Sequence, residues 1–226
     1  MCYRFISIFI VTLLLSSCSS PEPNITSNLR LLTTGRIVDE NLNALEGIFV
    51  EIELDNFNGT DLEIAQGFSD ANGEFSLTTL YGENDIFLVK IINNEGFSRY
   101  SYSVITEDYE PENLVFDLGE IQLKRLSSFQ LNVINSSLEN NTLEVEVNYE
   151  QPNCDVFYEG DTFIESNCFP PTSRVYQITE NNIDFERRLF VPLSSTVEIV
   201  YTINGGDQIT EQILINDTEV NYEINF

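Results

Sequence analysis

The amino-acid sequence predicts an all-β fold, with two antiparallel β-sandwich domains in tandem. Apolar and polar residues alternate with a period close to two in many short segments, as at 48–54, 143–150 and 220–226, and this pattern is typical of half-buried strands. Asn, Asp and Gly separate these segments at regular spacing, which favours antiparallel sandwiches. The length of the chain suits two small β domains better than one large domain.

The N-terminus has the three parts of a secretory signal. Arg4 supplies a positive charge, residues 5–15 form an apolar segment, and small residues precede Cys18. The apolar segment is shorter than the roughly 20 residues that a membrane-spanning helix needs. Residues 1–17 are therefore predicted to be a cleaved signal peptide.

The four residues that end this segment indicate how the mature chain is held. Leu15-Ser16-Ser17-Cys18 resembles the lipobox of bacterial lipoprotein precursors. The resemblance implies a lipid on Cys18, a tether over residues 18–30 and attachment to the cell envelope. No Asp follows Cys18, which by resemblance to lipoprotein sorting rules favours the outer membrane. An ordinary signal peptide with an incidental cysteine is the alternative.

The chain is strongly acidic. It has 37 acidic and 10 basic residues and a formal net charge of −27, spread over both halves. This field opposes binding to nucleic acid or to anionic headgroups, which need Lys and Arg surfaces. A solvated surface explains the acidity best, and cation binding is the functional alternative.

Two cysteines remain after the signal peptide and the lipidated residue are set aside. Cys154 and Cys168 are expected to form a disulfide, because an exported compartment permits oxidation. The loop would contribute about 3 kcal/mol in the chain-entropy model. A metal site is a poor alternative because the chain has no His to complete a tetrahedral set, and two free buried thiols are the remaining one.

The first domain, residues 31–125, carries a family resemblance. The segments GRIVDEN (35–41), ALEGIFVEI (44–52), SDANGEF (69–75) and DLGEIQL (117–123) resemble the carboxypeptidase regulatory-like domain family. The resemblance implies a transthyretin-like or Cna B-type sandwich of seven strands, used as a spacer or accessory module without peptidase chemistry. Gly47 and Gly73 stand where turns need left-handed dihedrals.

Some relatives are locked by an isopeptide bond from a Lys on the first strand. Here that strand offers Arg36, and the only lysines of the chain are Lys90 and Lys124. We therefore predict no such crosslink.

The second domain, residues 126–226, is predicted to be an immunoglobulin-like or related sandwich. Seven strands are expected at 129–134, 143–149, 174–179, 185–191, 197–203, 209–215 and 219–226. Between the second and third lies a stretch, 151–173, that we expect to be irregular and stapled by the disulfide. Binding often resides in such loops. The possible ligand-binding residues are Phe157, Tyr158, Phe163, Phe169 and Tyr176; the equally weighted alternative is that the rings cover an open end of the sandwich.

Other candidate sites are weaker. Residues 55–61 offer oxygen ligands for calcium but lack the usual spacing, so an acidic turn is the simpler interpretation. Arg187 and Arg188 could meet a carboxylate or phosphate, but neighbouring side chains of a strand point to opposite faces. We expect no metal and no cofactor. The chain has no His, so the usual general base is missing and no enzymatic activity is expected.

Two functions fit these observations. The first is a non-catalytic envelope lipoprotein that acts as a structural or interaction module and contacts another envelope protein. The alternative is a surface lipoprotein that binds carbohydrate or peptide through the aromatic loop. Exposed, coplanar rings at Phe157, Tyr158 or Tyr176 would favour glycan binding, and rings turned inward would favour the structural role.

Overall fold

The structure is a computed structural model that describes residues 25–55, 62–82, 86–92, 96–106, 114–136, 140–179 and 184–226. The signal peptide, Cys18 and the first part of the tether lie outside these residues. The described part consists of strands and their connections, which confirms the all-β prediction, and it contains no helix that could cross a membrane.

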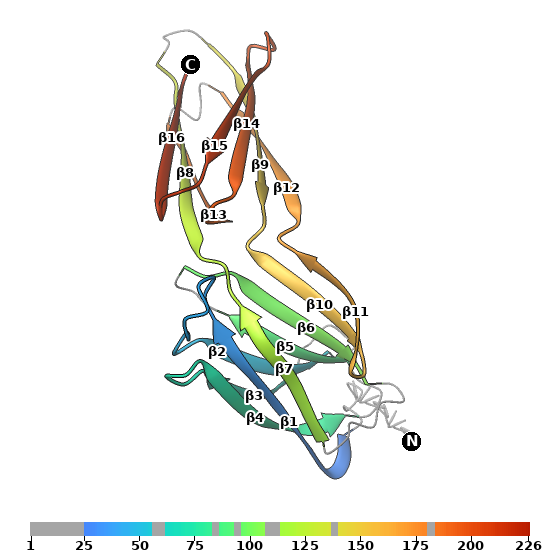
Figure 1. Cartoon of the computed structure of the whole chain (residues 1–226). Coiled ribbons are helices and arrows are strands. Elements are labelled where there is room, and N and C mark those ends of the chain that lie inside the picture. The colour runs from blue at the N-terminus through green and yellow to red at the C-terminus, as the bar shows by residue number, and fades with distance from the viewer. Residues whose placement is uncertain are drawn as a thin grey trace, which may run out of the picture.

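Seven strands form the first sandwich (Figure 1). They are β1 (Ile25–Val38), β2 (Phe49–Asp55), β3 (Leu62–Phe68), β4 (Glu74–Gly82), β5 (Ile86–Ile92), β6 (Arg99–Ile105) and β7 (Val115–Gln122). One sheet has the order β4-β1-β7, and the other contains β6-β5-β2-β3. The seven-stranded sandwich that the resemblance implies for this region is therefore present. Gly47 and Gly73 have φ angles of 76° and 77°, as their turns require.

Seven further strands form the second sandwich, and they match the seven that the sequence predicts. They are β8 (Leu126–Ile134), β9 (Leu143–Glu150), β12 (Pro171–Ile178), β13 (Asp184–Pro192), β14 (Thr196–Ile203), β15 (Ile209–Leu214) and β16 (Glu219–Asn225). Their sheets have the orders β13-β8-β16 and β12-β9-β14-β15.

The two sandwiches share one topology. In each, the first strand lies between the fourth and the seventh, and the other sheet has the order third, second, fifth, sixth. The first and last strands of each sandwich pair in parallel, as β1 with β7 and β8 with β16. The other pairs within the two seven-stranded sandwiches are antiparallel, as the sequence predicts. The repeat is in topology, because no repeated sequence accompanies it.

The stretch 151–173 is not irregular, and this corrects the sequence-based expectation. It contains β10 (Asn153–Glu159), β11 (Thr162–Cys168) and the start of β12. The β10–β11 hairpin leaves the second sandwich and extends a sheet of the first, giving the order β11-β10-β6-β5-β2-β3. Residues 153–168 therefore belong structurally to the first sandwich, and so does the disulfide.

Each sandwich has its own core. The first contains Ile37, Ile52, Ile91 and Leu123, and the hairpin adds Cys154 and Val156 to it. The second contains Phe129, Leu131, Leu143, Ile178 and Ile199. In Figure 1 the two sandwiches lie end to end, with the C-terminus at the far end of the second. The molecule is thus elongated, with two separate cores, and the hairpin connects the two sandwiches.

Candidate functional site

The hairpin is held along its whole length. β10 pairs in parallel with β6, from Asn153 opposite Arg99 to Glu159 opposite Ile105, and antiparallel with β11. Cys154 lies opposite Cys168, and the two form the predicted disulfide. The hairpin is therefore a closed element of the sheet, and its cross-link sits at the end nearer the second sandwich.

An aromatic cluster lies on the inner side of the hairpin. The ring of Tyr158 contacts Phe116 on β7 at 5.8 Å, Phe163 on β11 at 5.9 Å and Tyr102 on β6 at 6.5 Å between centroids. Burial raises the pKa of Tyr102 above its ordinary value, so this phenol stays neutral. The cluster closes the open side of the first sandwich, where the sheet that contains β6 extends past β7.

The structure does not bring the five predicted ligand-binding residues together. Tyr158 and Phe163 lie in the cluster just described, and Phe169 packs edge-on to Tyr100 at 6.3 Å. Phe157 points to the opposite face of the sheet, where it is 38% exposed. Tyr176 lies on β12, in the other sandwich. No shared, coplanar surface results, and this arrangement favours the structural role of the rings.

The sequence contains two local signals for the hairpin. Cys154, Val156 and Tyr158 alternate with Asp155, Phe157 and Glu159, of which two are acidic, and Gly160-Asp161 supplies a two-residue turn. Both features are hairpin signals. The pattern could have predicted the two strands, but the sheet that they join depends on contacts distant in sequence.

The chain passes between the sandwiches three times, and each crossing is short. One crossing is residues 123–125, between β7 and β8, and the others are 151–152 and 169–170 on either side of the hairpin. The backbone N–H of Gln151 donates to the Pro170 carbonyl at 3.0 Å, and that of Arg99 donates to the Pro152 carbonyl at 2.9 Å. Prolines limit the freedom of two crossings. Three short crossings resist bending and twisting between the sandwiches.

Charged side chains connect these crossings. The Lys124 ammonium lies 3.9 Å from the centre of the Phe169 ring and 3.9 Å from the Glu150 carboxylate. Arg125 Nη2 pairs with Asp39 at 3.2 Å, and its backbone N–H donates to Glu40 at 2.7 Å. All three crossings therefore meet at one junction, tied to the first turn of the first sandwich.

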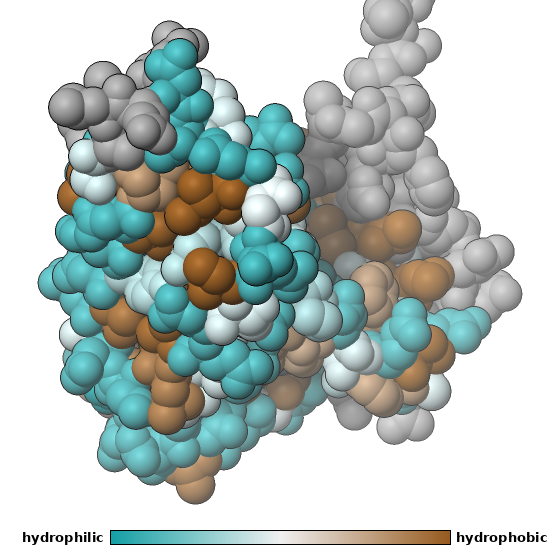
Figure 2. Space-filling view, turned by 90° about the horizontal axis from the view of Figure 1, so that it is seen from above, coloured by the Kyte–Doolittle hydropathy of each residue, from teal (hydrophilic) through white to brown (hydrophobic). Residues whose placement is uncertain are grey.

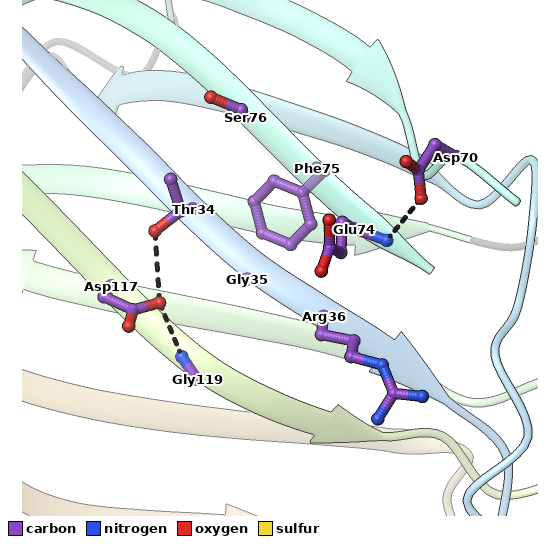
Figure 3. A pocket seen from close by; sticks show the side chains of 9 residues that line it. All are labelled: Thr34, Gly35, Arg36, Asp70, Glu74, Phe75, Ser76, Asp117 and Gly119. Atoms are coloured by element: carbon purple, nitrogen blue, oxygen red, sulfur yellow. Dashed lines mark hydrogen bonds between the residues drawn. The ribbon is translucent and has the colours of Figure 1, made fainter. Parts of the chain in front are cut away.

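A shallow hollow of about 480 Å³ lies over the sheet β4-β1-β7. Figure 3 shows the ring of Phe75 beside Gly35, with Asp117 accepting hydrogen bonds from Thr34 and from the Gly119 backbone. Arg36 forms an ion pair at 2.7 Å with Glu120, which Figure 3 does not draw. Asp117, Asp70 and Arg36 therefore have partners within the protein.

The remaining predicted sites divide between described and undescribed residues. Lys90 on β5 forms an ion pair with Glu53 on β2, and burial raises the pKa of the neighbouring Glu51, with Glu53 adding repulsion. Among the described residues, no group of three or more Cys, Asp or Glu could hold a metal ion. Residues 56–61 of the calcium-like segment lie outside the described part, as does Cys18.

Comparison with known proteins gives distant structural likeness only. No family model and no curated protein sequence matches the chain. A shaft pilin SpaA mutant from Lactobacillus rhamnosus GG is 9% identical over 87% of this chain and 98% of that one, with a TM-score of 0.33. The C-terminally truncated tip fimbrial protein Mfa3 from Porphyromonas gingivalis is 11% identical over 82% of both chains, with a TM-score of 0.32.

A third solved structure matches part of the chain. The 9R-lipoxygenase from Cyanothece PCC8801 is 13% identical over 44% of this chain and 18% of that one, with a TM-score of 0.31. These TM-scores are all below 0.5, and no conclusion about this protein rests on them.

Proposed function

We propose that this protein is a non-catalytic lipoprotein of the bacterial cell envelope. In this proposal, the lipid on Cys18 holds the chain to the membrane, most simply the outer membrane. The first sandwich, a carboxypeptidase regulatory-like domain by resemblance, stands nearest the lipid. The second sandwich is presented away from the membrane to another envelope protein.

The observation that carries the proposal is the triple crossing between the sandwiches. A spacer must hold its far end at a defined distance and orientation, and a single linker would act as a hinge. Here the hairpin returns to the first sandwich through two-residue connections that contain Pro152 and Pro170. The position of Tyr158, whose ring packs against Phe116 and Tyr102, supports the same role, since it weighs against the glycan-stacking alternative.

Small-angle X-ray scattering tests how stiff the junction between the two sandwiches is. The mature chain with Cys18→Ser should scatter as one elongated body in a single conformation. A variant in which residues 153–168 are replaced by a short Gly/Ser linker should show a broader distribution of intramolecular distances, because one crossing then remains intact. Equal flexibility in both proteins would contradict the spacer function.

Metabolic labelling with a radioactive fatty acid tests the anchor. Cys18→Ser should abolish incorporation of the label and release the protein from the membrane fraction, since several acyl chains are needed for stable attachment. Cys2→Ser is the matched control, because Cys2 lies in the predicted signal peptide, and it should leave both unchanged. Labelling that survives Cys18→Ser would refute the lipid anchor. This result would not affect the scattering test of the junction.

A further inference from the structure

The cations of the second sandwich gather on one side. Arg174, Arg187 and Arg188 are the only basic residues in 126–226, and they lie on β12 and β13, which are edge strands of opposite sheets. The rings of Tyr176 on β12 and Phe185 on β13 are 5.0 Å apart between centroids. The two edges therefore meet, and we call this surface the β12–β13 edge.

These arginines have no acidic partner among the described residues, although the chain has 37 acids. Arg174 Nε donates to the Tyr149 hydroxyl at 2.9 Å, and the Arg187 guanidinium lies 4.7 Å from the centre of the Phe185 ring. In the first sandwich and at the junction, ion pairs engage Arg36, Lys90, Lys124 and Arg125, whereas none is found for Arg30 and Arg99 among the described residues. Among the described residues, no ion pair neutralises the positive charge of the β12–β13 edge.

Register places two of the three arginines at the opening between the sheets. Arg174 lies opposite Val147 and Arg187 opposite Leu131, and both of these partners are buried in the core. Arg174 and Arg187 therefore sit on the core-facing side of their edge strands, yet both are exposed. Arg188 points to the opposite side of β13, where it donates to Gln130.

The β12 edge also differs from the other free edges. Of the eight edge strands in the described sheets, only β12 contains no acidic residue. Acids occur on all the others: Glu63, Glu74, Asp117, Glu120, Glu165, Asp184, Glu186, Glu211, Glu219 and Glu223. An edge strand has unpaired backbone donors and acceptors that an extended chain can use. An acidic strand would be repelled least at β12.

We propose that the β12–β13 edge binds an extended acidic segment of a partner polypeptide. The segment adds to β12 as a further strand, and its carboxylates meet the guanidinium groups of Arg174 and Arg187, which can bind them in a bidentate way. A polypeptide fits better than a glycan, because the rings of Tyr176 and Phe185 contact each other and Arg187 rather than standing open for stacking.

The rest of the distal surface is mainly polar. Figure 2 shows the molecule from above, onto its C-terminal end, where hydrophilic residues predominate and hydrophobic ones appear in small separate patches. The inference rests on the proposed interaction role but not on the lipid anchor or on the stiffness of the junction.

Fluorescence anisotropy tests the inference with the mature chain carrying Cys18→Ser. The probe is a labelled peptide of about ten residues, a long strand's length, with alternating Glu and Val. It should bind at low salt and dissociate as salt rises. The same peptide with Gln in place of Glu should bind at least about tenfold more weakly, because it offers no carboxylates to the two guanidinium groups. A version with Pro at its centre should also bind at least about tenfold more weakly, because Pro cannot complete a strand ladder.

Variants of the protein locate the site. Arg174→Gln with Arg187→Gln should weaken binding by at least about tenfold, since hydrogen bonds to charged groups are lost. Arg188→Gln removes one positive charge from the other face of β13 and should change binding by about twofold or less. Thermal melts confirm that each variant folds.

Three results would overturn the inference. They are no binding of the Glu peptide, equal weakening by Arg188→Gln and the double variant, or tighter binding of an oligogalacturonate than of the peptide. Undiminished binding of the Pro peptide would overturn the strand-addition part. The scattering test of the spacer function does not depend on peptide binding. A failure of this inference can therefore be distinguished from a failure of the spacer function.

Discussion

Asp39 ties the first turn of the first sandwich to the residue at which the second begins. Its buried carboxylate accepts hydrogen bonds from Asn41 and Asn43 and pairs with Arg125. The side-chain hydrogen bond from Asn43 is the main cause that lowers the pKa of Asp39 to about 2. One side chain thus organises a turn and orients the junction.

The pKa of Asp39 predicts a pH dependence. Because the folded pKa is below the ordinary value of 3.8, its stabilisation is present above that value and is lost as the pH falls through about 2. Asp39→Asn should lower the free energy of unfolding at pH 6, and the difference from the unsubstituted protein should shrink towards pH 2. Urea unfolding at several pH values measures this. A difference that stays constant across the range would contradict the assignment.

Gly73 is a second position where one residue decides local structure. Its φ is 77°, and a Cβ there would lie 2.3 Å from the Ile37 carbonyl oxygen. The turn between β3 and β4 therefore closes against β1, and this requires the absence of a side chain.

Gly73→Ala should destabilise the protein by at least about 2 kcal/mol, because the dihedral strain and the backbone clash add. Gly119→Ala is the matched control: its φ is 64°, but nothing lies within 4 Å of the added Cβ, so only about 1 kcal/mol is expected. Denaturant unfolding compares the two. Equal losses would mean that the close approach to Ile37 contributes nothing.

At the scale of elements, the β10–β11 hairpin decides how the sandwiches are joined. Its inner side supplies Cys154, Val156 and Tyr158 to the first core, while Phe157 and its outer neighbours face solvent. Strand alternation therefore gives two adjacent aromatic residues different roles. The inner ring holds the hairpin to the sheet.

This difference predicts unequal effects of two neighbouring substitutions. Tyr158→Ala should lower the free energy of unfolding by about 2 kcal/mol, because contacts with Phe116, Tyr102 and Phe163 are lost. Phe157→Ala should cost less than about 1 kcal/mol, as expected of an exposed side chain. Chemical denaturation measures both, and a larger loss for Phe157→Ala would reverse the assignment of inner and outer faces.

At the scale of the whole molecule, two copies of one topology are joined at three places. Each copy has its own core, so each could unfold separately. The hairpin opposes this, because residues between β9 and β12 complete the sheet of the first sandwich. Unfolding of the second sandwich would pull on the ends of that hairpin.

Calorimetry tests this coupling. The mature chain should unfold in one cooperative transition. Replacement of residues 153–168 by a short Gly/Ser linker should split it into two transitions, with the first sandwich melting at the lower temperature because it loses Val156, Tyr158 and the disulfide. Two transitions in the unaltered chain would contradict coupling through the hairpin.

Local pattern was enough for the seven strands of the second sandwich and for the disulfide. The alternation at 143–150 and 197–203 predicted β9 and β14, because period two is a property of neighbouring residues. Cys154 and Cys168 were the only cysteines left for pairing. The turns at Gly47 and Gly73 followed from the backbone freedom of Gly.

Only the tertiary structure decided which strands become neighbours. The sequence of 151–173 does not reveal that β6, some fifty residues earlier, offers a free edge, so the hairpin was assigned to the wrong sandwich. Nor does it reveal that Arg174 and Arg187 meet on one side of the second sandwich. Sheet pairing joins segments that are distant along the chain, and its outcome depends on which edges and core faces the rest of the fold leaves open. By itself, the sequence determined the strands of the second sandwich, the acidity and the cysteine pair; the junction and the arginine surface depend on packing between distant segments.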